Sequence, residues 1–408
     1  MSERETHWTY GGWPVAAAAS VVAFMSSSFL MSFSAFFTPL SDEFGWSRQA
    51  VSGAYACLTL TFAAVAPLVG QLIDRWGPRL VFIPGAVVGG CAFASLSTLT
   101  AHLSHLYAAF TLVGLGAAGT SSVAFSRLIA TWFTRRRGFA LSVVIGSLGL
   151  GSVVHPAIAA TLIERVGWRV TYLVMGTAVI VVAVPIIVRY VHEPDSEELS
   201  RRGRRITVPV ADAVRSRVFL TLLAVVFGST IVMNGAIVHL APLLIDRGIP
   251  ASLALVAVSS MGAASLVGRL LAGWCLDRFS AIRVAIVLLL VASTGTLLLS
   301  RATSFPMGLT SALLIGFGTG GDLDVTPYLL ARYFGLGSLS TLYGISWTVF
   351  GIAAAAGPVV MGRAFDLTGS YQQVLLVLSV GTLTAAALML TMPAVPTLEV
   401  TSPALHPS

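Results

Sequence analysis

The segment Gly70-Gln71-Leu72-Ile73-Asp74-Arg75 ends a long apolar run, and it recurs 203 residues later as Gly273-Trp274-Cys275-Leu276-Asp277-Arg278. Two more pairs repeat after 201 and 202 residues: Leu128–Phe133 with Leu329–Phe334, and Gly149 and Pro156 with Gly351 and Pro358. Such a constant register indicates an internal duplication. The sequence therefore predicts two similar halves of about 200 residues each.

The segments between these motifs are long and apolar. Of the 408 residues, 56% are hydrophobic and only 10% are charged, and the mean hydropathy is +0.87. Soluble domains carry roughly 25% charged residues, so the composition argues against a soluble enzyme or a nucleic-acid-binding protein. A membrane helix needs about 20 apolar residues, and such runs occur at residues 14–38, 49–73, 80–100, 105–133, 138–163, 169–189, 218–245, 251–276, 282–300, 306–333, 338–362 and 371–392. We therefore predict an all-α integral membrane protein with about 12 transmembrane helices in two pseudo-symmetric six-helix halves.

Arginine placement predicts the orientation of these spans. All 24 basic residues are arginines, and most lie in short clusters between the apolar runs. With both termini in the cytoplasm, sixteen arginines lie inside and six outside, and the other two, Arg127 and Arg269, lie within spans. The positive-inside rule favours this orientation. The polar stretch 192–217 then links an N-terminal half, residues 1–191, to a C-terminal half, residues 218–393, with a tail at 394–408. The basic run Arg201–Arg205 is too short, and too close to membrane spans, to favour nucleic-acid binding.

Two glycine motifs resemble a dinucleotide-binding fingerprint. Gly114–Gly119 and Gly316–Gly321 both fit G-x-G-x-x-G, but each lies inside an apolar run rather than between a strand and a helix. We interpret them as positions where small residues let helices approach closely in lipid. The sequence has no hydrolase or ATP-binding motif, and its three cysteines, Cys57, Cys91 and Cys275, lack metal-ligand spacing. We therefore expect no enzymatic activity, no cofactor and no metal site.

The loop Gly70–Arg79 resembles the signature G-x-L-x-D-R-x-G-x-R that follows the second span in the major facilitator superfamily. Its degenerate copy follows the eighth span, as in that family, and Arg136–Ala140 resembles the basic start of the fifth span. Three shorter segments, 44–48, 132–138 and 365–371, look like those of the monocarboxylate and oxalate/formate transporter group. The resemblance covers residues 10–393, and it implies a transporter that works by alternating access.

The resemblance also implies a gating motif. Its predicted members are Gly70, Asp74, Arg75, Gly77, Arg79, Asp277 and Arg278. Asp74 lies where it can pair with an arginine and cap the N-terminus of a neighbouring helix, which would hold the two halves together on the cytoplasmic side. The alternative is that these charges only set the topology. Gly77 and Pro78 would form a tight turn in either case.

Charged residues inside the spans mark a candidate substrate site, because a charge at the bilayer centre costs at least ~2.5 kcal/mol. Arg269 in the eighth span is the principal candidate, since a guanidinium matches a carboxylate and the related transporters bind substrate with an arginine at this position. Asp322 and Asp324 lie at a similar depth in the tenth span. Residues two apart on a helix point ~200° apart, so we expect only one of them to face the cavity. A purely structural Arg–Asp pair is the alternative.

Other polar residues in the spans complete the predicted site. Ser121, Tyr328 and His239 join the substrate-binding set, and His155 joins the two aspartates as a proton-coupling candidate. For each histidine the alternative is a hydrogen-bonded structural role. We interpret Arg127, near the end of the fourth span, as a structural arginine that reaches towards the membrane surface.

The chain departs from its relatives at two positions. Oxalate exchangers carry a lysine in the eleventh span, whereas this chain has no lysine and no other basic residue between Leu342 and Gly362. One central cation suits one carboxylate. Monocarboxylate carriers place an aspartate one turn before the arginine, where this chain has Ser265. We therefore expect a tenth-span aspartate to supply the acid: when the substrate takes over the arginine, this aspartate loses its counter-ion and binds a proton.

These features predict a carrier in the bacterial inner membrane that moves a small organic monocarboxylate and is coupled to protons. Its partners would be the organic anion, protons and membrane lipid, with no nucleic acid, and we expect a monomer. A drug or metabolite exporter of the same fold is the first alternative, since Gly146, Gly149, Gly151 and Pro156 partly match the antiporter signature. A membrane sensor is the second, although the tail from Pro393 is short and polar for a signalling domain.

Overall fold

The computed structural model describes residues 11–192, 194 and 208–393. The side chains of Arg48, Gln49, Asp322 and Leu323 lie outside this description, so the predicted site residue Asp322 is located only by its backbone. The described part consists of helices joined by short loops, without a strand.

The first half of the chain forms long helices with one short 3-10 turn. α3 begins after Ser47, whose hydroxyl accepts a hydrogen bond from the backbone N–H of Ala50 at 3.2 Å, as an N-cap residue does. The elements are α1 (Gly12–Met31), α2 (Phe33–Phe44), α3 (Arg48–Trp76), α4 (Arg79–Ser95), η2 (Leu96–Thr98), α5 (Leu103–Gly119), α6 (Ser122–Trp132) and α7 (Arg137–Tyr190).

The second half repeats this pattern. α10 also begins after a serine, Ser216, whose hydroxyl accepts from the backbone N–H of Phe219 at 3.2 Å. The elements are α9 (Val210–Arg215), α10 (Arg217–Asp246), α11 (Ala251–Leu276), α12 (Ala281–Ser300), α13 (Phe305–Gly320), α14 (Asp322–Tyr333), α15 (Leu339–Thr368) and α16 (Gln372–Leu390).

The predicted fold class is confirmed, because the helices make twelve passes. Ten helical stretches of the described chain are long and apolar enough to cross a membrane. One of them, α7, contains two passes, which meet at Gly167 with a φ of 79°. The tenth pass is divided between α13 and α14, each of which is shorter than a full span. Every predicted apolar run therefore corresponds to one pass.

Three predicted runs are broken, which the sequence analysis did not anticipate. The run at 14–38 breaks at Ser32, whose hydroxyl donates to the carbonyl of Ser28 at 2.6 Å; such back-bonding bends helices. The runs at 105–133 and 306–333 break at Thr120–Ser121 and at Gly321. The last two breaks occupy equivalent places in the two halves, so the duplication extends to the interruptions.

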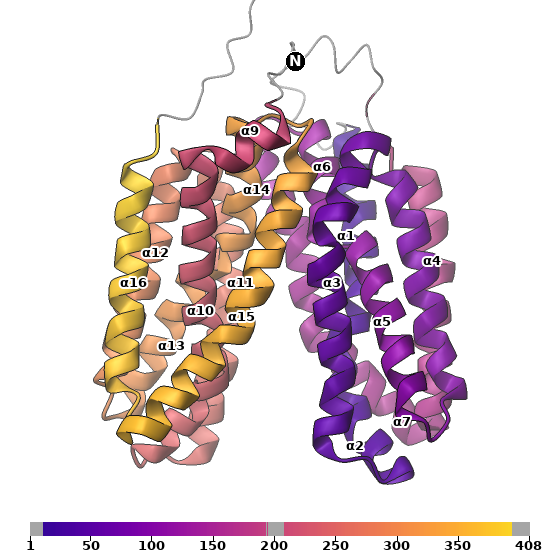
Figure 1. Cartoon of the computed structure of the whole chain (residues 1–408), viewed down its shortest axis with the longest axis horizontal. Coiled ribbons are helices and arrows are strands. Elements are labelled where there is room, and N and C mark those ends of the chain that lie inside the picture. The colour runs from indigo at the N-terminus through magenta and orange to yellow at the C-terminus, as the bar shows by residue number, and fades with distance from the viewer. Residues whose placement is uncertain (1–10, 193, 195–207, 394–408) are drawn as a thin grey trace, which may run out of the picture.

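The passes form two bundles that meet at one end. Figure 1 shows α1–α7 on one side and α10–α16 on the other, converging where α6, α9 and α14 lie and diverging at the end where α2 lies. We call the converging end, which carries Asp74 and Asp277, the motif end, and the other the opposite end. Contacts between the bundles run mainly through two helix pairs, α3 with α15 and α7 with α11.

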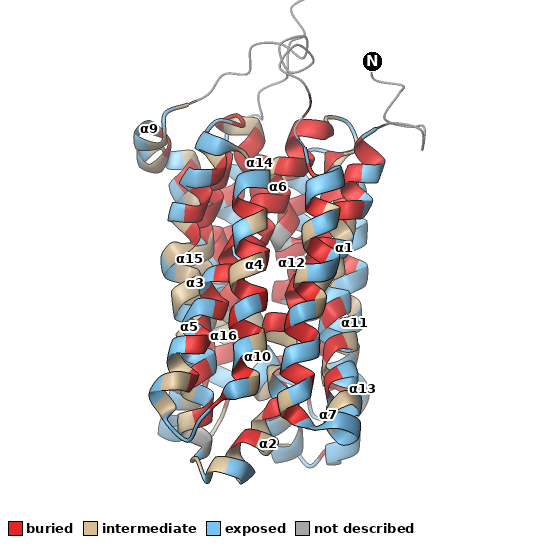
Figure 2. Ribbon diagram, turned by 90° about the vertical axis from the view of Figure 1, so that its right-hand side faces the viewer, coloured by how far each residue is buried: buried red, intermediate tan, exposed pale blue. Residues whose placement is uncertain are grey.

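The glycine motifs are packing positions, as interpreted from the sequence. A Cβ on Gly114 would lie 2.5 Å from the carbonyl oxygen of Leu58 on α3, and one on Gly316 would lie 2.1 Å from that of Met261 on α11. Neither position tolerates a side chain, so both glycines serve close helix approach. Figure 2 shows buried residues on the inner faces of the helices and exposed residues on the outer faces. Exposed Val377 and Leu390 on α16 suit contact with lipid.

The described end of the predicted linker packs against the motif end. Residues 193 and 195–207, which include Arg201–Arg205, lie outside the described residues, as do 1–10 and 394–408. The backbone N–H of Val208 donates to the carbonyl of Phe334 at 3.1 Å, and Ser338 Oγ donates to the carbonyl of Val208 at 2.8 Å. The linker therefore contacts the loop between α14 and α15, ahead of the short helix α9.

Candidate functional site

A buried charge pair joins α11 to α14. Arg269 Nε lies 3.9 Å from Asp324 Oδ2, and the two side chains are 12% and 0% exposed. The same Nε donates to the carbonyl of Gly320 at 3.2 Å. The structure thus brings together Arg269 and Asp324, two of the residues singled out in the sequence.

The break between α13 and α14 places this pair. α13 ends at Gly320 and α14 begins at Asp322, so Asp324 lies in the first turn of the new helix. A Cβ on Gly320 would lie 2.1 Å from the carbonyl of Ser265, and one on Gly268 would lie 2.2 Å from that of Phe317. Only glycine allows α11 and α13 to approach this closely, and the approach brings Arg269 to the broken helix end.

Asp324 is incompletely satisfied. Ser142 Oγ on α7 lies 3.4 Å from Asp324 Oδ2, but this hydroxyl has one proton and lies closer, at 3.0 Å, to the carbonyl of Gly138. Asp324 Oδ1 is buried and has no hydrogen-bond partner among the described residues. A buried carboxylate oxygen without a partner is costly. The site therefore favours the arrival of a proton or of a ligand.

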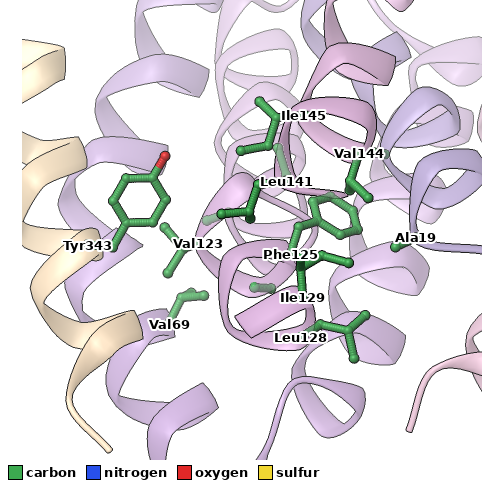
Figure 3. Close-up of a cluster of buried hydrophobic side chains, with 14 of the residues drawn as sticks. Ala19, Val69, Val123, Phe125, Leu128, Ile129, Leu141, Val144, Ile145 and Tyr343 are labelled. Atoms are coloured by element: carbon green, nitrogen blue, oxygen red, sulfur yellow. The ribbon is translucent and has the colours of Figure 1, made fainter. Parts of the chain in front are cut away.

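Residues that the sequence analysis missed surround the pair. Tyr343 on α15 is close enough to Arg269 and Asp324 for electrostatic interaction, and Trp347, one turn further along α15, lies against Tyr343. Figure 3 shows Tyr343 beside apolar side chains of the other bundle, including Val123 on α6. A tyrosine in an apolar span gives no signal by itself, since it is most often core. Its position at the junction of the bundles becomes visible only in three dimensions.

Ser121 and Tyr328 lie at different levels of this region. Ser121 precedes α6, and its hydroxyl is buried without a hydrogen-bond partner among the described residues. Tyr328 lies one turn beyond Asp324 on α14, towards the motif end, and its hydroxyl accepts a hydrogen bond from Arg332 at 3.2 Å. Tyr328 is thus held by its own helix.

Both intramembrane histidines are hydrogen bonded. His155 Nε2 lies 2.8 Å from the carbonyl of Phe24, so this nitrogen is the donor and ties α7 to α1. His239 Nε2 lies 3.0 Å from the carbonyl of Pro358, and its Nδ1 lies 3.1 Å from the hydroxyl of Tyr371. Since a carbonyl only accepts, Nε2 carries the proton and Nδ1 accepts from the tyrosine. His239 thus joins α10 to α15 and to the start of α16.

The motif aspartate Asp74 binds the start of α15. Its carboxylate accepts hydrogen bonds from the backbone N–H groups of Ser340 at 3.0 Å and Thr341 at 2.8 Å. It also pairs with Arg127 at 3.0 Å, and Arg127 donates to the carbonyl of Leu336 at 2.9 Å. A carboxylate at a helix N-terminus is favourable because it satisfies free donors and interacts with the helix dipole. Asp74 thus fastens the N-terminal bundle to the C-terminal one.

The second copy makes the reciprocal contact. Asp277 on the C-terminal bundle accepts from the backbone N–H groups of Gly138 at 2.7 Å and Phe139 at 2.9 Å, at the start of α7. Gly77 has a φ of 82°, as the predicted turn requires. Arg278 lies over the ring of Trp274 at 3.9 Å, while Arg75 and Arg79 are exposed at the motif end. A Cβ on Gly70 would lie 2.2 Å from the carbonyl of Ser340, so this glycine allows α3 to meet α15.

The contact between the bundles ends partway along the helices. On α7 and α11 the glycine contacts run from Gly138 against Gly273 to Gly146, whose Cβ would lie 3.9 Å from Leu266. One turn further from the motif end, Cβ atoms on Gly149 and Gly262 would have open space around them. Arg269 lies on the same face of α11 as Gly262, two turns nearer the motif end. The two bundles are therefore in contact at the motif end and apart between Arg269 and the opposite end.

Comparison with known proteins assigns the family. Residues 17–358 match the family model described as Major Facilitator Superfamily. The uncharacterized MFS-type transporter YcxA of Bacillus subtilis is 26% identical over 372 residues, which cover 88% of this chain and 90% of that protein. Human monocarboxylate transporter 11 is 26% identical over 381 residues, covering 88% and 78%. The solved structure of the E. coli fucose:proton symporter FucP superposes with a TM-score of 0.72 at 13% identity, covering 92% of this chain and 97% of that one. A chain of twelve passes in two latched bundles, with a buried charge pair where they meet, thus belongs to the major facilitator superfamily of membrane transporters.

Proposed function

We propose that this transporter carries a small organic monocarboxylate together with a proton. The observation that supports this most is the buried Arg269–Asp324 pair, in which the arginine keeps 12% of its side chain exposed and the aspartate is fully buried. A guanidinium presents a planar set of donors that matches a carboxylate. Several relatives at low identity are named monocarboxylate transporters, which is consistent with this substrate class.

The charges of the site explain why substrate and proton bind together. Without ligand, Arg269 and Asp324 neutralise one another. A carboxylate that takes over the arginine leaves Asp324 buried as an uncompensated anion, which is strongly unfavourable in a membrane interior. Protonation of Asp324 restores a neutral site, and Oδ1, which has no hydrogen-bond partner among the described residues, is the oxygen free to take the proton. The fully loaded and the empty carrier then have the same net charge, and both can change conformation.

Reorientation follows from the two aspartate contacts at the motif end. The motif end faces the cytoplasm in this proposal, because most arginines lie in the segments at that end. The structure then corresponds to a carrier open to the outside of the bacterial inner membrane. Release of the Asp74 and Asp277 contacts would open the cytoplasmic side and close the outer one, which is alternating access between the halves.

A transport assay tests the assignment of Arg269 and Asp324. We expect Arg269→Ala and Arg269→Lys to lose uptake of carboxylates into proteoliposomes, since an ammonium does not reproduce the guanidinium fork. Asp324→Asn should keep exchange of substrate for substrate but lose accumulation driven by a pH gradient. Arg169→Lys, which changes an exposed arginine paired with Glu43 at the opposite end, is the matched control.

The outcomes separate the alternatives. Wild-type uptake by Arg269→Ala would contradict carboxylate binding by this residue. Accumulation by Asp324→Asn as strong as that of the wild type would exclude it as the proton carrier and return attention to Asp322 and His155. Stabilisation of the purified protein by cationic drugs and not by organic acids would favour an exporter of the same fold.

A further inference from the structure

Ser142 connects the buried charge pair to the other bundle. Its side chain is fully buried on α7, in the N-terminal bundle, whereas Asp324 lies on α14, in the C-terminal bundle. Ser142 Oγ lies 3.4 Å from Asp324 Oδ2 and 3.0 Å from the carbonyl oxygen of Gly138, one turn earlier on α7. A serine hydroxyl has one proton, so it donates to one of these two acceptors at a time.

Ser142 also lies one turn from a contact that closes the motif end. The backbone N–H of Gly138 donates to Asp277 Oδ1 at 2.7 Å. A Cβ on Gly273, one turn before Asp277 on α11, would overlap Ser142 Oγ, so the hydroxyl occupies the space that this glycine leaves open. The hydroxyl therefore lies where α7 packs closely on α11, beside the Asp277 contact.

The charge of Asp324 decides which acceptor Ser142 uses. A hydrogen bond to a carboxylate is roughly twice as strong as one to a neutral carbonyl. An ionised Asp324 therefore draws the hydroxyl proton to Oδ2 and pulls α7 towards α14, because an ordinary O–H···O bond measures about 2.7 Å rather than the present 3.4 Å. Once Asp324 is protonated, the carbonyl of Gly138 is the nearer of two neutral acceptors. The bond then stays within α7 and no longer joins the bundles.

The other groups that face Asp324 belong to its own bundle. Arg269 on α11 lies 3.9 Å away, and Tyr343 on α15 is within electrostatic reach. When each bundle moves as a unit, both groups move with Asp324, so neither contact depends on closure of the motif end. The other packed helices, α7, α10 and α12, carry ionisable residues near their ends or bonded to other partners: Arg137, His155, Arg217, His239, Asp246 and Arg283. Ser142 is therefore the group whose contact with Asp324 changes when the bundles separate.

We infer that Ser142 couples the charge of Asp324 to closure of the motif end. The inference rests on the proposed function and adds how the same site controls reorientation. While Asp324 is ionised and paired with Arg269, Ser142 holds α7 against α14, and this favours the form closed at the motif end. When a substrate carboxylate takes over the arginine and Asp324 binds a proton, this hold is lost and the populations shift towards forms open at that end. Ser142 is a positioning residue, because it acts through Asp324 and does not contact the substrate.

Alkylation of a cysteine between the bundles measures opening of the motif end. Leu276 is 1% exposed, and a Cβ on Gly138 would lie 2.9 Å from its Cβ, so a cysteine introduced by Leu276→Cys reacts when α7 and α11 separate. The reagent is N-ethylmaleimide, applied to the purified full-length protein without native cysteines and without substrate. We expect Ser142→Ala to raise the alkylation rate at least about tenfold, which corresponds to ~1.4 kcal/mol.

A second background isolates the role of the charge. Asp324→Asn keeps the shape of the side chain and removes its charge. In this background Ser142→Ala should raise the rate at most about threefold, since a neutral hydrogen bond is the weaker one. Ser147→Ala is the matched control: Ser147 lies further along α7 and donates to the carbonyl of Val143 at 3.0 Å, and its loss should leave the rate unchanged in both backgrounds.

The results distinguish this inference from the proposed function. An effect of Ser142→Ala that is as large with Asp324→Asn as without it would assign the serine a purely structural role and overturn the inference. An unchanged rate in Ser142→Ala would overturn it too. The proposed function fails separately, in the transport assay, if Arg269→Ala keeps uptake or Asp324→Asn keeps accumulation driven by a pH gradient. The alkylation rates are measured without substrate, so they do not depend on that outcome.

Discussion

Substitution of Gly138 by alanine should open the motif end. A Cβ at this position would lie 2.4 Å from the carbonyl oxygen of Gly273 and 2.9 Å from Asp277 Oδ1, whereas ordinary contacts begin at 3.4 Å. α7 and α11 must therefore separate by about 1 Å, which also stretches the bonds from Asp277 to the start of α7. Overpacking of this kind costs about 1–3 kcal/mol. Since 1.4 kcal/mol corresponds to a tenfold change in an equilibrium constant, the population of the closed form should fall roughly five- to 150-fold relative to forms open at the motif end.

Spin-label distances across the motif end measure this shift. Leu80 and Phe279 lie at the motif end on different bundles and are 62% and 58% exposed, so cysteines there accept labels in a background without native cysteines. We expect a second, longer distance population in Gly138→Ala. Gly149→Ala is the matched control, since it lies on the same face of α7 with open space around its Cβ and gains the same helix propensity. A wild-type distribution in Gly138→Ala, or the same shift in both variants, would refute the reasoning.

Three further expectations follow from the described contacts. Arg127→Ala removes the pair with Asp74 at 3.0 Å and should lengthen the same label distance, with an unchanged distribution counting against the latch. His155→Leu removes the hydrogen bond to the carbonyl of Phe24 and should lower the free energy of unfolding by about 1–3 kcal/mol, measured by thermal unfolding. The pH profile of transport should stay the same. A shifted pH profile at unchanged stability would instead support a role of His155 in proton transfer. Single cysteines introduced within 192–217 should resist an impermeant thiol reagent added to intact cells, and labelling from outside would reverse the proposed topology.

The passes could be predicted because the membrane imposes a length and a composition on each of them. Runs of about 20 apolar residues located all twelve. The breaks at Ser32 and Gly321 escaped prediction because serine and glycine also occur inside unbroken membrane helices. Whether such a residue interrupts a helix depends on its neighbours in space, such as the close packing of Gly320 against Ser265.

The candidate site could be predicted only where it carries charge. Arg269 and Asp324 stood out because ionised groups are rare in spans, and helical spacing limited the cavity-facing role to one of two aspartates. Ser142 and Tyr343 escaped because serines and tyrosines are common in membrane helices. Which end is open was also beyond the sequence, since the same residues must support both conformations of an alternating carrier.

The two aspartate contacts at the motif end have the pattern of an isologous dimer interface. Each half gives a carboxylate to the second and third residues of a helix in the other half. The contact that the first half makes to the second is therefore repeated by the second half to the first. Each carboxylate accepts hydrogen bonds from two backbone N–H groups, and these groups are present whatever side chains the opposing helix carries. Asp74 also accepts from the side chains of Arg127 and Thr341. The two copies have accordingly been free to diverge around their aspartates: Gly77 of the first turn corresponds to Ser280 in the second, yet both latches remain formed. A contact made to main-chain groups therefore persists while the side chains around it change.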